Sequence, residues 1–148
     1  GTITDLNVKI PSLDMASSNI QYLTIILLSP YGTAVKLADS YNTGSKFDGI
    51  LYLTTLDDEA STGFGDASPP YTGTYKPWES LSSFDGQSIT GDWSLVVYSR
   101  YDYNGTIDWK LSVETDNSTA YDKPNWLVYL LLHRDVGEVS IHKLLQDE

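Results

Sequence analysis

Cysteine is absent from this sequence of 148 residues, and only two histidines and one methionine occur in it. A chain without thiols cannot form a disulfide, a thiolate nucleophile, or a cysteine-based zinc or iron–sulfur site. Basic residues are also scarce, with nine Lys and Arg against twenty Asp and Glu and a net charge of −11. This charge repels phosphate backbones, which argues against nucleic-acid binding, and it favours the capture of hard cations by carboxylates.

Long hydrophobic runs are missing as well. The longest wholly apolar run is Trp126–Leu132, which is too short to span a bilayer, so the sequence predicts no membrane span. The composition is nevertheless that of a folded chain, with 41% hydrophobic and 12% aromatic residues. Its length suits one domain, and its acidity suits a secreted, extracellular protein.

Hydrophobic residues recur at every second position over much of residues 1–116, which indicates strands rather than helices. A turn is predicted at Ser29-Pro30-Tyr31-Gly32, where proline presets φ and glycine closes the turn. The pattern predicts an all-β fold, a jelly-roll-like β-sandwich of about eight to nine strands with a C-terminal β-hairpin or strand extension. The clearest strand covers residues 106–114, with inward positions at Ile107, Trp109, Leu111 and Val113.

The composition changes near the C-terminus. We expect a sandwich over residues 1–115, a linker over 116–125, and an apolar extension over 126–148 that forms a hairpin or a docking strand. A strand with apolar residues on both faces must be covered, either by its own sandwich or by a neighbouring copy. Because the sandwich pattern is complete at Val113, the sequence favours the neighbouring copy. The predicted assembly residues are Trp126, Leu127, Tyr129 and Leu131.

Neither histidine lies in the sandwich region, since His133 and His142 both follow residue 125. A Ser-His-Asp triad needs an imidazole beside the nucleophile, and no nucleophile motif accompanies these two histidines. The sequence therefore predicts that the chain is not an enzyme.

Five segments in order carry a family resemblance. They are residues 23–33 with Ser-Pro-Tyr-Gly-Thr, 56–60 with Asp-Asp-Glu-Ala, 71–87 with Tyr-Thr-Gly-Thr-Tyr-Lys-Pro and Leu-Ser-Ser-Phe-Asp-Gly-Gln, 91–95 with Gly-Asp-Trp-Ser-Leu, and 105–111 with Gly-Thr-Ile-Asp-Trp-Lys-Leu. In this order they resemble the P domain (P/Homo B domain) of kexin- and furin-like proprotein convertases. The chain departs from the family pattern at Tyr22 and Ser99, where the family has aspartate.

The resemblance implies a jelly-roll sandwich that performs no chemistry itself. In that family the domain lies beside a subtilisin-like serine protease domain and supports its folding, stability and calcium dependence. The function expected is therefore a non-catalytic extracellular module that stabilises or positions a protein partner or an adjoining catalytic domain. Two alternatives stay open: a structural assembly subunit of a filament, coat or virion whose tail engages a neighbour, and a glycan-binding module.

Calcium is the cofactor that the sequence suggests. Asp57, Asp58 and Glu59 offer three hard oxygen donors in succession, and the resemblance places Asp102 nearby. The alternative for Asp58 is a turn cap that accepts hydrogen bonds from backbone amides.

Loop aromatics offer a second candidate surface. Tyr71, Tyr75 and Trp78 form one group, and Tyr101 and Tyr103 form another, as possible glycan or partner contacts. Such residues stack on sugars or, alternatively, close the ends of a hydrophobic core.

Overall fold

The computed structural model describes residues 1–15, 23–39, 50–68, 70–99, 103–116, 118–122, 126–132 and 138–145. These residues form ten strands and two short 3₁₀ helices, which confirms the all-β prediction. No helix within these ranges is long and apolar enough to cross a membrane.

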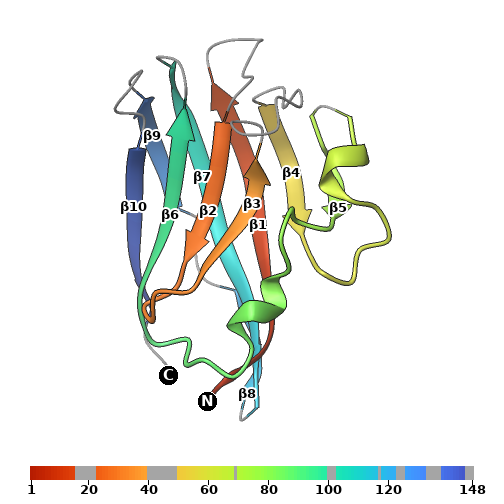
Figure 1. Cartoon of the computed structure of the whole chain (residues 1–148), viewed down its shortest axis with the longest axis vertical. Helices are drawn as coiled ribbons and strands as arrows, with labels where there is room; N and C mark the ends of the chain where they lie inside the picture. The colour runs from red at the N-terminus through yellow and green to blue at the C-terminus, as the bar shows by residue number, and fades with distance from the viewer. Residues whose placement is uncertain are drawn as a thin grey trace.

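The strands form two sheets that face each other as a sandwich (Figure 1). The first sheet has the order β5-β4-β1-β7-β8, and β9 also pairs with β7; the second has the order β10-β6-β2-β3. The first contains β1 (Ile3–Met15), β4 (Ile50–Leu56), β5 (Gly73–Tyr75), β7 (Tyr103–Thr115), β8 (Ser118–Asp122) and β9 (Trp126–Leu132), and the second contains β2 (Leu23–Leu28), β3 (Ala34–Asp39), β6 (Gly91–Ser99) and β10 (Glu138–Leu145). The helices η1 (Phe64–Asp66) and η2 (Leu81–Phe84) come between β4 and β6 in the sequence.

The core lies between the sheets and follows the alternation of the sequence. On β7 every predicted inward residue is buried, while the intervening residues are more exposed. The two tryptophans Trp93 and Trp109 are the largest fully buried side chains. The other core residues of the central strands include Leu6, Val8, Ile10, Leu23, Ile25, Leu27, Leu95, Val97, Ile107, Leu111 and Val113.

The predicted turn at Ser29–Gly32 is confirmed. The Gly32 N–H donates to the Ser29 carbonyl over 3.1 Å, and Gly32 has a φ of 86° that favours glycine. The Ser29 hydroxyl also accepts from the backbone amides of Tyr31 and Thr33. These bonds hold the hairpin between β2 and β3.

Strand β1 is central although it contains Pro11. A proline cannot donate to a ladder and is expected in a central strand only at an irregularity. The register with β7 shifts between Lys9 and Ser12, and the register with β4 omits the pair Pro11 and Leu53. Leu53 has a φ of 49°, so both strands deviate where the proline removes a hydrogen bond.

The C-terminal region corrects two expectations. Strand β8 lies within the predicted linker and pairs with the end of β7. Strands β9 and β10 pair with β7 and β6 of the same chain, so the predicted pairing with a neighbouring copy is wrong for these strands. The physical reason is that the first 115 residues complete a core pattern but leave one edge of β6 and of β7 without a strand, and the tail supplies both.

Candidate functional site

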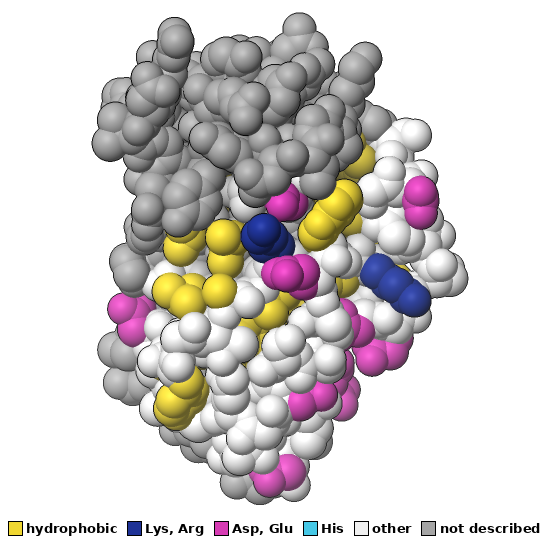
Figure 2. All heavy atoms as spheres, in the orientation of Figure 1, with side chains coloured by type: hydrophobic (Ala, Val, Ile, Leu, Met, Phe, Trp, Pro, Cys, Tyr) yellow, Lys and Arg dark blue, Asp and Glu magenta, His cyan; other side chains and the backbone are white. Residues whose placement is uncertain are grey.

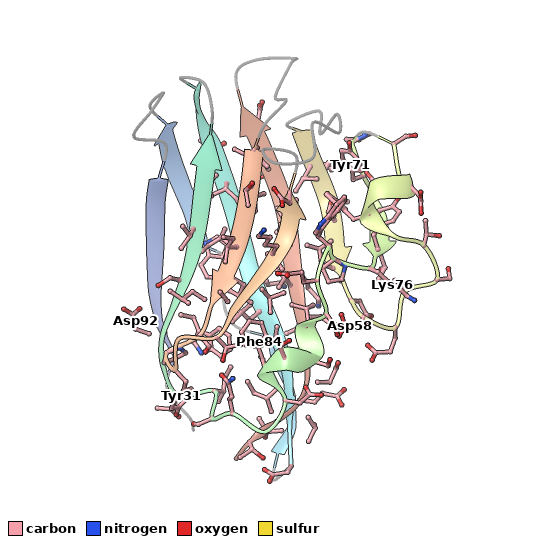
Figure 3. All side chains as sticks on the ribbon, viewed as in Figure 1. Tyr31, Asp58, Tyr71, Lys76, Phe84 and Asp92 are labelled. Atoms are coloured by element: carbon pink, nitrogen blue, oxygen red, sulfur yellow. The ribbon has the colours of Figure 1, made fainter. Side chains whose placement is uncertain are left out.

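Among the residues that the structure describes, one polar cluster is centred on Asp58, just after β4. Its carboxylate accepts from the Ser80 hydroxyl at 2.6 Å and from the amides of Leu81 and Ser82 at 2.9 and 2.8 Å. These amides belong to the first turn of η2, where unpaired N–H groups attract a carboxylate. Asp58 and η2 lie side by side (Figure 3). We call this arrangement the Asp58 cap, and it is the turn-capping role that the sequence left open.

Asp57 and Glu59 flank the cap but do not join it. The Asp57 carboxylate accepts from the Glu59 amide at 2.8 Å, and the Asp57 carbonyl accepts from Ala60 at 3.1 Å. No group of three potential metal ligands occurs among the residues that the structure describes, and the fourth predicted ligand, Asp102, lies outside them. The contacts of Asp58 therefore fit backbone capping better than coordination of calcium.

Negative charges concentrate around the cap. Burial raises the pKa of Asp5 on β1, and the charge of Asp57 raises it further. Burial also raises the pKa of Asp85 at the end of η2, with a further contribution from Asp58. Figure 2 shows Asp and Glu side chains on the surface around the position that Figure 3 labels Asp58. This end of the sandwich is strongly acidic.

Among the acidic residues around the cap, Glu59 has the pKa that departs furthest from its ordinary value. A hydrogen bond to the Asp57 side chain, followed by desolvation and by the charge of Asp5, raises the pKa of Glu59 from 4.5 to about 7. The folded state therefore holds a proton that the unfolded chain releases at lower pH. The stability that depends on this proton is present at acidic pH and is lost as pH rises through about 7.

We expect wild-type protein to lose stability between about pH 4.5 and about pH 7, and Glu59→Gln to show a shallower loss. The effect is small because Glu59 is exposed. Urea midpoints measured at steps of pH check it, with Glu79→Gln as the control for removal of a glutamate charge elsewhere. Parallel pH profiles for wild type and Glu59→Gln would show that Glu59 does not carry the effect.

The first aromatic group is largely structural. Tyr71 is only 4% exposed and its ring lies 4.9 Å from that of Phe64, so its expected role in a surface platform is wrong. Its φ of 58° lies in the left-handed region, which residues with a side chain seldom adopt. Tyr75 is half-buried and its hydroxyl donates to the Thr72 carbonyl at 2.9 Å. Only Trp78, at 44% exposure, offers an open face.

The remaining predicted residues are placed only in part. Tyr101 lies outside the described residues, and Tyr103 is the first residue of β7. The four predicted assembly residues all lie in β9. In the ladder Trp126 pairs with Trp109, Leu127 with Asp108, Tyr129 with Thr106 and Leu131 with Asn104.

Residues 78–79 cover the edge of β3. The amides of Trp78 and Glu79 donate to the carbonyls of Leu37 and Lys36 at 3.1 and 2.9 Å. The Lys36 amide in turn donates to the Glu79 carboxylate at 2.7 Å. Backbone groups that would otherwise point outward from β3 are thus paired along this stretch.

One contact escaped the sequence analysis. Gly91 begins β6 with a φ of 129°, and a Cβ at this position would lie 2.6 Å from Cβ and Cγ of Pro30 in the β2–β3 turn. Two residues later, the Trp93 indole N–H donates to the Ile89 carbonyl at 2.9 Å, and its ring meets Phe84 edge-on at 5.2 Å. The only signal in the sequence was a glycine at the start of a strand pattern.

Comparisons with protein-family models, with curated proteins and with solved structures give no match to this chain. The class that the fold defines is an all-β protein with two facing sheets. Among the described residues, the Asp58 cap is a polar cluster that binds the chain's own backbone.

Proposed function

We propose that this chain is a non-catalytic extracellular β-sandwich module, similar to the convertase P domain, that stabilises or positions a partner domain. The proposal rests on the resemblance of the five segments. The observation that carries it is that segments far apart in the sequence contact one another in the fold.

These contacts link the resembling segments in a chain. Asp58 of the second segment caps η2 of the third. Phe84 of the third packs against Trp93 of the fourth, whose Gly91 lies against Pro30 of the first. The fifth segment contributes the buried Trp109. Segments that contact one another in this way hold the fold together. This supports a role as a folded support rather than as a catalyst.

Calcium enters this proposal through the resemblance alone. Asp57, Asp58 and Glu59 would supply oxygen donors beside Asp102. The Asp58 oxygens already accept three hydrogen bonds from residues 80–82. For this reason no part of the proposed support role depends on a bound metal.

The experiment begins with the coding sequence on either side of this chain. We expect it to encode an adjoining domain, of subtilisin-like type, that loses activity faster when this chain is deleted. The purified chain alone should not turn over peptide or glycan substrates. An adjoining domain of equal lifetime with and without this chain would refute the support role.

Assembly is the second candidate, and one observation favours it. Among the described strands, β9 and β10 are edges with no further strand beyond them. An assembly based on these strands would use the tail after it has joined its own sandwich.

A further inference from the structure

We draw no further inference here: the strongest candidate, the apolar patch that Ile26, Leu28 and Val96 form on the outward face of β2 and β6 (Figure 2), carries nothing, because nothing in the structure shows what covers it.

Discussion

Gly91→Ala is expected to lower the free energy of unfolding by about 3–5 kcal/mol, since it combines backbone strain with overpacking. The φ of Gly91 is 129°, a conformation that residues with a side chain rarely adopt. The added methyl would also lie 2.6 Å from two carbon atoms of Pro30. The turn between β2 and β3 would have to move away from the start of β6. Chemical denaturation measures the resulting loss in the free energy of unfolding.

Gly32 supplies the matched control. Its φ is 86°, and a Cβ there would meet nothing within 4 Å. Gly32→Ala therefore tests backbone strain without a clash, and we expect a loss of about 1–2 kcal/mol. Equal losses in the free energy of unfolding for Gly91→Ala and Gly32→Ala would show that the clash with Pro30 does not contribute to the destabilisation.

Asp58→Ala is expected to lower the free energy of unfolding by about 2–4 kcal/mol. The substitution removes the acceptor for two amides and one hydroxyl of residues 80–82. Asp58→Asn keeps one acceptor oxygen, so its free energy of unfolding should fall by an intermediate amount. Asp57→Ala removes one accepted amide bond and the side-chain hydrogen bond with exposed Glu59, and it should cost less, about 0.5–1.5 kcal/mol.

The same variants separate capping from calcium binding. If Asp58 acts as a cap, the loss caused by Asp58→Ala will be the same in calcium and in chelator, because hydrogen bonds to backbone need no metal. If Asp58 binds calcium, wild type will melt at a higher temperature in calcium than in chelator, and Asp58→Ala will abolish that difference. Melting curves of metal-free wild type and variant in both conditions decide between the two roles.

The sequence predicted those parts of the fold that depend on neighbouring residues. Alternation along residues 106–114 correctly located the buried face of β7, because a strand turns successive side chains to opposite faces. The turn at Ser29–Gly32 was predictable because proline and glycine restrict or permit particular φ values. Both features can be derived without knowledge of any distant contact.

Features that depend on distant contacts were not predictable in this way. A complete hydrophobic pattern at Val113 says nothing about whether the outer edges of β6 and β7 have partners, and the tail was misassigned for that reason. Tyr71 is buried against Phe64 and has a positive φ, and periodicity reveals neither feature. Asp58 was recognised as a polar site, but its partners lie more than twenty residues away.

The support role is tested most directly by destabilising the sandwich and measuring how long the adjoining domain stays active. The adjoining domain, expressed with this chain, should be compared with forms carrying Gly91→Ala or Gly32→Ala, by the half-life of its activity at elevated temperature. The support role predicts that Gly91→Ala shortens the half-life of the adjoining domain's activity much more than Gly32→Ala does. This is the same order as the expected losses in the free energy of unfolding of the sandwich. Equal half-lives in all three proteins, with the sandwich of the Gly91→Ala form shown to be destabilised, would contradict it.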